Sequence, residues 1–310
     1  MNWFHDYEEE LRSVFEECKE LISQFPEPLN TRGLTYLNHF NVFETGSHKN
    51  YICYLLPFWF KEPCNLTVMD CRQMSKGNIF LMLYFFIQDD LMDQRTPSAS
   101  STLPLANLLY IEFLNIYRSY FPGKDPFWKY FNRYISEWAD SVSNESTQDY
   151  FRDEQVKIAH KASPLKLSST AALLLAGKDS LIPHSEELLD YVLLTLQMLD
   201  DYEDWEEDLE EGNYNCLLSL ARQTWFNNKD HLTRDDIKDF IYSKRGLEHY
   251  ADLAQSYHNR LLNHNLKIPH LLDFNLLLAT NLKKIVSAIE AEKALLQGGG
   301  LQYWLSKNMK

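Results

Sequence analysis

Apolar residues recur at helical spacing along almost the whole chain. In the first segment, Leu11, Val14, Phe15, Cys18 and Ile22 follow the three- and four-residue spacing that puts side chains on one helix face. We find no alternating strand pattern of useful length, and proline and glycine divide the chain into segments. The predicted helices are 3–24, one or two within 30–64, 66–93, 104–120, 126–142, 148–176 with a break at 163–164, 186–212, 214–226, 234–242, 246–263 and 270–296.

This pattern predicts an all-α fold with a single domain over residues 1–310. Residues 297–310 contain the glycine run 298–300 and are expected to form a flexible tail. No apolar run approaches the roughly 20 residues needed to span a bilayer. The acidic N-terminus also lacks the order of a signal peptide. We therefore predict a cytoplasmic protein without stable membrane insertion.

The net charge and the cysteine content restrict which ligands and which thiol chemistry we expect. The formal net charge is −14, which disfavours nucleic acid because phosphate backbones are bound by clustered lysine and arginine. The five cysteines are odd in number and lack paired metal-type spacing, which favours reduced thiols. A polyanionic ligand would therefore need a metal ion or a local basic patch.

Two clusters of aspartates suggest such a metal. The first lies in residues 89–93, at the end of the apolar run 79–87, and the second lies in residues 200–208. On a helix Asp200, Asp204 and Asp208 overlie one another, and like charges at that spacing repel. Carboxylates without a cysteine or histidine partner suit Mg²⁺. The sequence therefore predicts a magnesium site.

Both clusters match motifs of a known family. Residues 89–93, DDLMD, resemble the DDxxD motif of class I isoprenoid synthases, and residues 197–204, QMLDDYED, resemble the QxxDDxxD motif of trans-prenyl diphosphate synthases. The resemblance covers roughly residues 40–215. It implies a single-domain helical bundle around a central cavity, in which three Mg²⁺ ions clamp a prenyl diphosphate, with Mn²⁺ as a substitute. It also makes a homodimer an open alternative to a monomer.

The resemblance assigns roles residue by residue. Asp89 and Asp93 would hold two ions, and Asp200 together with Asp204 and Asp208 the third. Asp90 and Asp201 would orient basic groups or waters beside them. The full metal-binding set expected is Asp89, Asp90, Asp93, Asp200, Asp201, Asp204 and Asp208. The residues expected to support this set are Gln197 and Gln88.

Basic residues for the diphosphate follow from the same resemblance. Residues 161–166, KASPLK, lie where prenyl synthases carry a Lys-Thr pair, so Lys161 is the first choice and Lys166 and Lys157 are rivals. Arg95 follows the first motif, and Arg152 lies near the spacing of the arginine sensor of terpene cyclases. The expected catalytic set is Asp89, Asp93, Asp200 and Lys161.

The departures from the family suggest which reaction follows. Elongating enzymes carry a Gly-Lys-Arg-x-Arg segment, two arginines after the first motif and a lysine after the second. This chain has residues 46–49, GSHK, then Arg95 alone, and the acidic run 206–211. A second anionic substrate would find few cations here.

We therefore predict a terpene synthase, a lyase that ionises a linear C10–C25 prenyl diphosphate and cyclises or rearranges the cation with release of pyrophosphate. Aromatic faces stabilise such cations, and the candidates are Phe58, Trp59, Phe85, Phe86 and Tyr202. One alternative is a trans-prenyl diphosphate synthase or other prenyltransferase that condenses the allylic diphosphate with a second substrate. Another is a non-catalytic helical partner that regulates a synthase.

Overall fold

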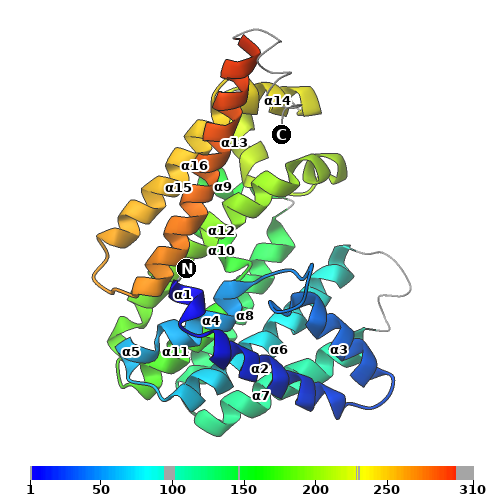
Figure 1. Ribbon diagram of the computed structural model, residues 1–310, viewed down its shortest axis with the longest axis vertical. Coiled ribbons are helices and arrows are strands. Elements are labelled where there is room, and N and C mark those ends of the chain that lie inside the picture. The colour runs from blue at the N-terminus through cyan, green and yellow to red at the C-terminus, as the bar shows by residue number, and fades with distance from the viewer. Residues whose placement is uncertain (1, 94–101, 146, 228, 230, 298–310) are drawn as a thin grey trace. The chain divides into compact units, whose positions relative to one another are not determined.

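A computed structural model describes residues 2–93, 102–145, 147–227, 229 and 231–297 (Figure 1). Within these ranges the chain forms helices joined by turns and contains no strand, which confirms the all-α prediction. No helix among them combines the length and apolar character needed to cross a membrane. All five cysteines carry free thiols. The predicted tail lies outside the described residues apart from Gln297.

The chain divides into two compact units, each built from three segments. Unit 1 comprises Met1–Trp138, Ala162–Glu186 and Ile268–Leu271, and unit 2 comprises Ala139–Lys161, Glu187–Lys267 and Leu272–Lys310. Three of the unit boundaries fall inside helices α8 (Phe127–Asn144), α12 (Ile182–Glu211) and α16 (Pro269–Gln297), and the other two, after Lys161 and after Lys267, fall between helices. A single domain over residues 1–310 stays a prediction.

Unit 1 is built around α6 (Val68–Asp93), and α2, α4 and α7 all pack against it. The residues from Ile79 to Leu83 are all buried, as expected of a helix enclosed by neighbours. The other helices that lie wholly in this unit are α1 (Asn2–His5), α2 (Glu8–Ser23), α3 (Leu29–Phe40), α4 (Tyr51–Trp59), α5 (Lys61–Cys64), α7 (Leu103–Tyr120), η2 (Ser163–Leu165), α11 (Lys166–Leu175) and η3 (Asp179–Leu181).

Gly77 explains how α7 comes so close to α6. A Cβ atom at this position would lie 2.7 Å from Cε2 of Tyr117 on α7. Only glycine leaves room for that ring, so α6 continues through a residue that usually weakens a helix. The uninterrupted helix brings the first aspartate motif to its C-terminal end.

Unit 2 is organised around α13, which packs against α9, α14 and α15. The buried hydroxyl of Tyr250 on α15 donates a hydrogen bond of 3.0 Å to the carbonyl of Met198 on α12. This contact anchors α12 two residues before Asp200, the first aspartate of the second motif. The helices that lie wholly in this unit are α9 (Tyr150–Asp153), α10 (Val156–His160), α13 (Cys216–Thr224), α14 (Arg234–Tyr242) and α15 (Gly246–Leu262).

The structure corrects three predicted segments. The predicted helix 3–24 is divided by a turn at residues 6–7 into the two helices α1 and α2. The region 30–64 holds three helices rather than one or two. The predicted helix 148–176 is broken at 163–164 as expected, but it is also broken earlier, because Glu154 leaves the helical conformation with φ −156° and ψ 75°. The two short helices α9 and α10 therefore replace its first half.

Candidate metal and diphosphate site

The first aspartate motif occupies the last turn of α6 in unit 1. Asp89 and Asp90 are exposed, and Asp93 is the last residue of the helix. Gln88, which precedes them, is half-buried. The helix therefore presents the carboxylates of Asp89 and Asp90 to solvent near its C-terminal end.

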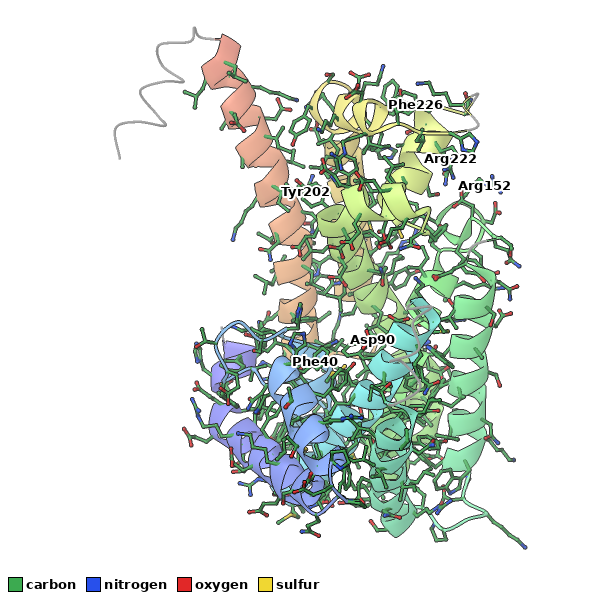
Figure 2. The ribbon with its side chains drawn as sticks, turned by 90° about the vertical axis from the view of Figure 1, so that its right-hand side faces the viewer. Phe40, Asp90, Arg152, Tyr202, Arg222 and Phe226 are labelled. Atoms are coloured by element: carbon green, nitrogen blue, oxygen red, sulfur yellow. The ribbon has the colours of Figure 1, made fainter. Side chains whose placement is uncertain are left out.

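Asp90 is held by a neighbour that the sequence did not reveal. The hydroxyl of Tyr36 on α3 donates a hydrogen bond of 3.1 Å to Oδ2 of Asp90. Burial and the Asp90 carboxylate both raise the pKa of Tyr36 above its usual value. The ring of Phe40, one turn further along α3, packs 4.9 Å from that of Phe86. Figure 2 labels Phe40 and Asp90 in unit 1. Helix α3 thus supports the motif, and Asp90 has a positioning contact.

In the second motif, Asp200 and Asp204 stand on the open face of α12. Both are exposed, and no residue in the described part of the chain donates a hydrogen bond to either. Although part of the Asp200 side chain reaches solvent, surrounding protein desolvates its carboxylate, and this desolvation and the nearby carboxylates of Asp201, Glu203 and Asp204 raise the pKa of Asp200 to about 7. Burial and Asp208 raise that of Asp204. These two side chains repel one another and remain accessible to a cation.

Asp201 has a different environment, although it is adjacent to Asp200. Its side chain is buried. Its Oδ1 accepts a hydrogen bond of 2.6 Å from Nε2 of Gln197, and its Oδ2 accepts one of 2.6 Å from the backbone N–H of Cys216. Both oxygens are therefore engaged by protein donors. The Gln197 contact fits its expected supporting role, and these bonds favour positioning over metal ligation for Asp201.

The carboxylate of Asp208 also accepts a hydrogen bond, from the turn that follows α12. Nδ2 of Asn215 donates 2.8 Å to Oδ2 of Asp208 and 2.7 Å to the carbonyl of Asp201. The Asn215 side-chain oxygen meanwhile caps α13 by accepting from the N–H groups of Leu217 and Leu218. Sequence reasoning missed Asn215, although an asparagine before an apolar helix is a recognised N-cap signal.

The predicted basic residues lie in different surroundings. Lys161 belongs to unit 2, forms an ion pair with Glu145, and lines a small cavity together with Gln197 and Asp201. Arg152 forms two hydrogen bonds, of 2.7 and 2.8 Å, with its exposed neighbour Asp153. Of these residues, only Lys161 lies beside the second motif in unit 2.

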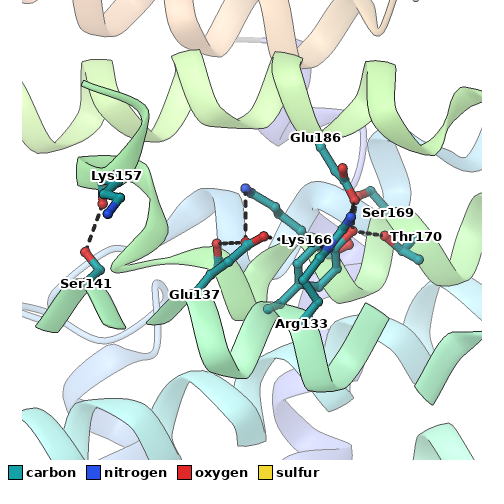
Figure 3. A network of polar contacts seen from close by, with 10 residues as sticks. Arg133, Glu137, Ser141, Lys157, Lys166, Ser169, Thr170 and Glu186 are labelled. Atoms are coloured by element: carbon teal, nitrogen blue, oxygen red, sulfur yellow. Dashed lines mark hydrogen bonds and ion pairs between the residues drawn. The ribbon is translucent and has the colours of Figure 1, made fainter. Parts of the chain in front are cut away.

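Lys166 belongs to unit 1 and is almost fully buried. Its Nζ lies 3.8 Å from Oε2 of Glu137, which also accepts 2.7 Å from Oγ of Ser163 (Figure 3). Arg133 on α8 pairs with Glu186 in the same network. Lys166 is thus the buried member of a polar network within this unit. Arg95 lies outside the described residues.

The acidic run after the second motif has partners that the sequence did not reveal. Arg234 forms ion pairs with Glu206 and Glu210, and Lys238 lies 3.8 Å from Glu206. Both basic residues belong to α14, about 30 positions further along the chain. Helix α14 therefore compensates part of this acidic surface.

The donor set of the motifs suits a hard cation. Asp200 and Asp204 offer carboxylate oxygens four residues apart, without a protein cation bound to them among the described residues. Mg²⁺ prefers such ligands and is commonly held by one or two carboxylates plus phosphates. The residues present therefore fit the predicted metal.

Comparison with known proteins identifies the fold. No family model and no curated protein sequence matches the chain. A geranylgeranyl pyrophosphate synthetase of the archaeon Geoglobus acetivorans superposes with a TM-score of 0.69 at 17% identity, covering 91% of this chain and 98% of that one. The geranylgeranyl pyrophosphate synthase of Lactobacillus brevis gives 0.69 at 17% identity, covering 89% and 97%.

A third solved structure is a polyprenyl synthase of Caulobacter crescentus complexed with calcium and isoprenyl diphosphate. It superposes with a TM-score of 0.62 at 14% identity and covers 88% of this chain and 96% of that one. The chain thus has the all-α fold of the class I isoprenoid synthases, as its two aspartate motifs led us to expect.

Proposed function

We propose that the protein is a Mg²⁺-dependent prenyltransferase that acts on an allylic prenyl diphosphate. One observation carries the proposal: Asp200 and Asp204 form an accessible carboxylate pair that receives no hydrogen bond from the described residues, while Asp201 and Asp208 beside them are held by protein donors. Because no donor among the described residues offsets the charge of these two carboxylates, they are suited to binding a metal ion that carries a diphosphate.

The reaction would proceed by loss of diphosphate. The allylic C1–O bond breaks with its electron pair passing to the diphosphate, a nucleophilic carbon of the second substrate bonds to C1, and the product loses a proton. Mg²⁺ bound to the aspartates would supply charge stabilisation for the leaving group. Lys161 would donate hydrogen bonds to its oxygens, where fixed charge is most effective.

The comparisons support condensation over cyclisation. The similar structures carry the names of geranylgeranyl and polyprenyl synthases, and the likeness extends over 88–91% of this chain. We therefore prefer the prenyltransferase to the terpene synthase that the departures from the family motifs suggested. The chain length of the substrate, within C10–C25, belongs to this proposal.

A specific observation keeps the terpene synthase as a second candidate. In the segment 46–49 of unit 1, Lys49 is the one permanently charged side chain, and the exposed ring of His48 packs 4.5 Å from that of His39. A second diphosphate would therefore meet fewer cations here than in an enzyme with several arginines. A cyclase needs no such site.

One assay separates these reactions. Purified protein is incubated with Mg²⁺ and geranyl, farnesyl or geranylgeranyl diphosphate, each with and without isopentenyl diphosphate, and products are identified by mass spectrometry. We expect a longer prenyl diphosphate only when isopentenyl diphosphate is present. Hydrocarbons or alcohols from an allylic diphosphate alone would support the cyclase instead.

The same assay addresses a non-catalytic role. The variant Asp89→Ala plus Asp200→Ala should lose pyrophosphate release in every reaction. If wild-type protein is inactive with every substrate, and this variant still supports full activity of a partner synthase, the regulatory alternative replaces our proposal.

A further inference from the structure

The ammonium group of Lys161 lies in an enclosed polar environment within unit 2. Lys161 follows α10, and its side chain is only 29% exposed. It lines a cavity with Asp201, and its positive charge partly offsets the rise in the Asp201 pKa that burial causes. The predicted diphosphate-binding lysine is thus adjacent to the second aspartate motif.

Glu145 forms an ion pair with this lysine. Its Oε2 atom is shielded from solvent and, within the described residues, receives no hydrogen bond. The same atom forms an ion pair with Nζ of Lys161. A buried carboxylate oxygen without a cation is costly, so Glu145 strongly favours the conformation in which Lys161 stays beside it.

Tyr150 also lies next to Lys161 in this environment. Its side chain is 2% exposed, and its hydroxyl has no hydrogen-bond partner in the described part of the chain. It lines the cavity beside Lys161 and Asp201, which has a volume of about 10 Å³. That is close to the space one water molecule needs, and the site offers the polar partners a buried water requires.

We propose that Glu145 is a positioning residue that fixes Lys161 for binding the diphosphate, an inference that rests on the proposed function. A lysine side chain loses much rotamer freedom when it is fixed, and a site that is already ordered binds its ligand more tightly. An ammonium group has three donors, so one lysine can form an ion pair with Glu145 and also donate to a phosphate oxygen.

The test measures binding of inorganic pyrophosphate with Mg²⁺ by calorimetry, together with steady-state turnover. Glu145→Gln should weaken pyrophosphate binding and raise the KM for the allylic diphosphate by roughly tenfold, the size expected when a lysine side chain is no longer held in one rotamer. The Mg²⁺ concentration for half-maximal activity and kcat should change little. Glu145→Asp should restore part of the loss.

A double-mutant cycle separates positioning from a general structural effect. If Glu145 acts through Lys161, adding Glu145→Gln to Lys161→Ala should cause no further loss. Glu290→Gln is the matched control, because Glu290 forms an ion pair of 2.5 Å with Lys293 in unit 2. It should bind pyrophosphate as the wild type does. Thermal unfolding midpoints of all variants verify that each is folded.

The outcomes are distinguishable. Unchanged or tighter pyrophosphate binding by Glu145→Gln, or losses that multiply in the double variant, would overturn the positioning role alone. Wild-type protein that neither binds pyrophosphate with Mg²⁺ nor releases it from any prenyl diphosphate would overturn the proposed function and this inference with it.

Discussion

Adjacent aspartates in the second motif have unlike environments because a helix points successive side chains about 100° apart. Asp200 and Asp204 share the accessible face, whereas Asp201 points inward to Gln197 and the N–H of Cys216. The four aspartates within residues 200–208 therefore form two pairs. Asp200 and Asp204 are accessible and suited to a metal, whereas Asp201 and Asp208 accept hydrogen bonds from the protein and are suited to holding the helix end.

Asp201→Asn and Asp204→Asn test this division. At Asp201 the new amide would direct a donor at Gln197 or at the N–H of Cys216, so we expect a loss of about 1–3 kcal/mol in the free energy of unfolding. At Asp204 the change removes repulsion from Asp200, so stability without Mg²⁺ should rise by about 0.2–0.5 kcal/mol. Urea unfolding without Mg²⁺ measures both.

The variant that is less harmful to stability, Asp204→Asn, should be the one with the larger change in Mg²⁺ dependence. Asp204→Asn should need more Mg²⁺ for half-maximal activity, and Asp201→Asn, where folded, should need about the wild-type amount. Equal shifts for the two variants would contradict the division of roles.

The sequence could identify the aspartates and the nearby Gln197, but not the partners that lie far away in the chain. The spacing of Asp200 and Asp204 is a local property, readable from helix geometry. The donors to Asp201 and Asp90 come from Cys216 and Tyr36, which lie 15 and 54 residues away. Contacts of that range depend on how helices pack, which periodicity does not specify.

At the scale of elements, one asparagine connects two helices. Asn215 caps α13 through its oxygen and binds Asp208 and the carbonyl of Asp201 on α12 through its nitrogen. A side chain with both a donor and an acceptor is needed for this. The end of the second motif therefore depends on the turn that follows it.

We expect Asn215→Ala to destabilise the protein by about 1–3 kcal/mol, from loss of the cap and of hydrogen bonds to buried groups. Asn215→Ser keeps an acceptor for the cap but cannot reach as far, so it should recover only part of the loss. Urea unfolding compares the three proteins. A serine variant as stable as the wild type would show that the bonds to α12 contribute little.

Helix packing also decides the effect of Gly77→Ala. Alanine normally favours a helix by about 0.5–1 kcal/mol over glycine, but here its Cβ would lie 2.7 Å from the Tyr117 ring. Overpacking costs about 1–3 kcal/mol, so we expect net destabilisation in thermal unfolding. Gly123→Ala, with no atom within 4 Å, is the control and should be nearly neutral.

Helix positions were largely predictable, and the exceptions have local causes. The long helices α6, α7 and α15 match their predicted ranges within two residues, because proline and polar turns mark their ends. The break at Glu154 has no such marker in the sequence, and the apolar pattern continues through it. Gly77 is the reverse case, a residue that suggests a break where packing against Tyr117 preserves the helix.

At the scale of the whole molecule, ligand binding should raise the stability of the folded protein. A ligand that binds only the folded state raises stability in proportion to the logarithm of its concentration over its dissociation constant. The net charge of −14 opposes binding of a free polyanion, so Mg²⁺ and pyrophosphate should act together rather than singly.

We therefore expect the thermal midpoint to rise by roughly 4 °C when Mg²⁺ and inorganic pyrophosphate are both present at about 100 times the dissociation constant. Pyrophosphate with excess EDTA should give little shift, because the carboxylates repel the bare anion. Mg²⁺ with sulfate controls for ionic strength. The variant Asp200→Ala plus Asp204→Ala should lose the shift, and its persistence there would mean that pyrophosphate binds elsewhere on the protein.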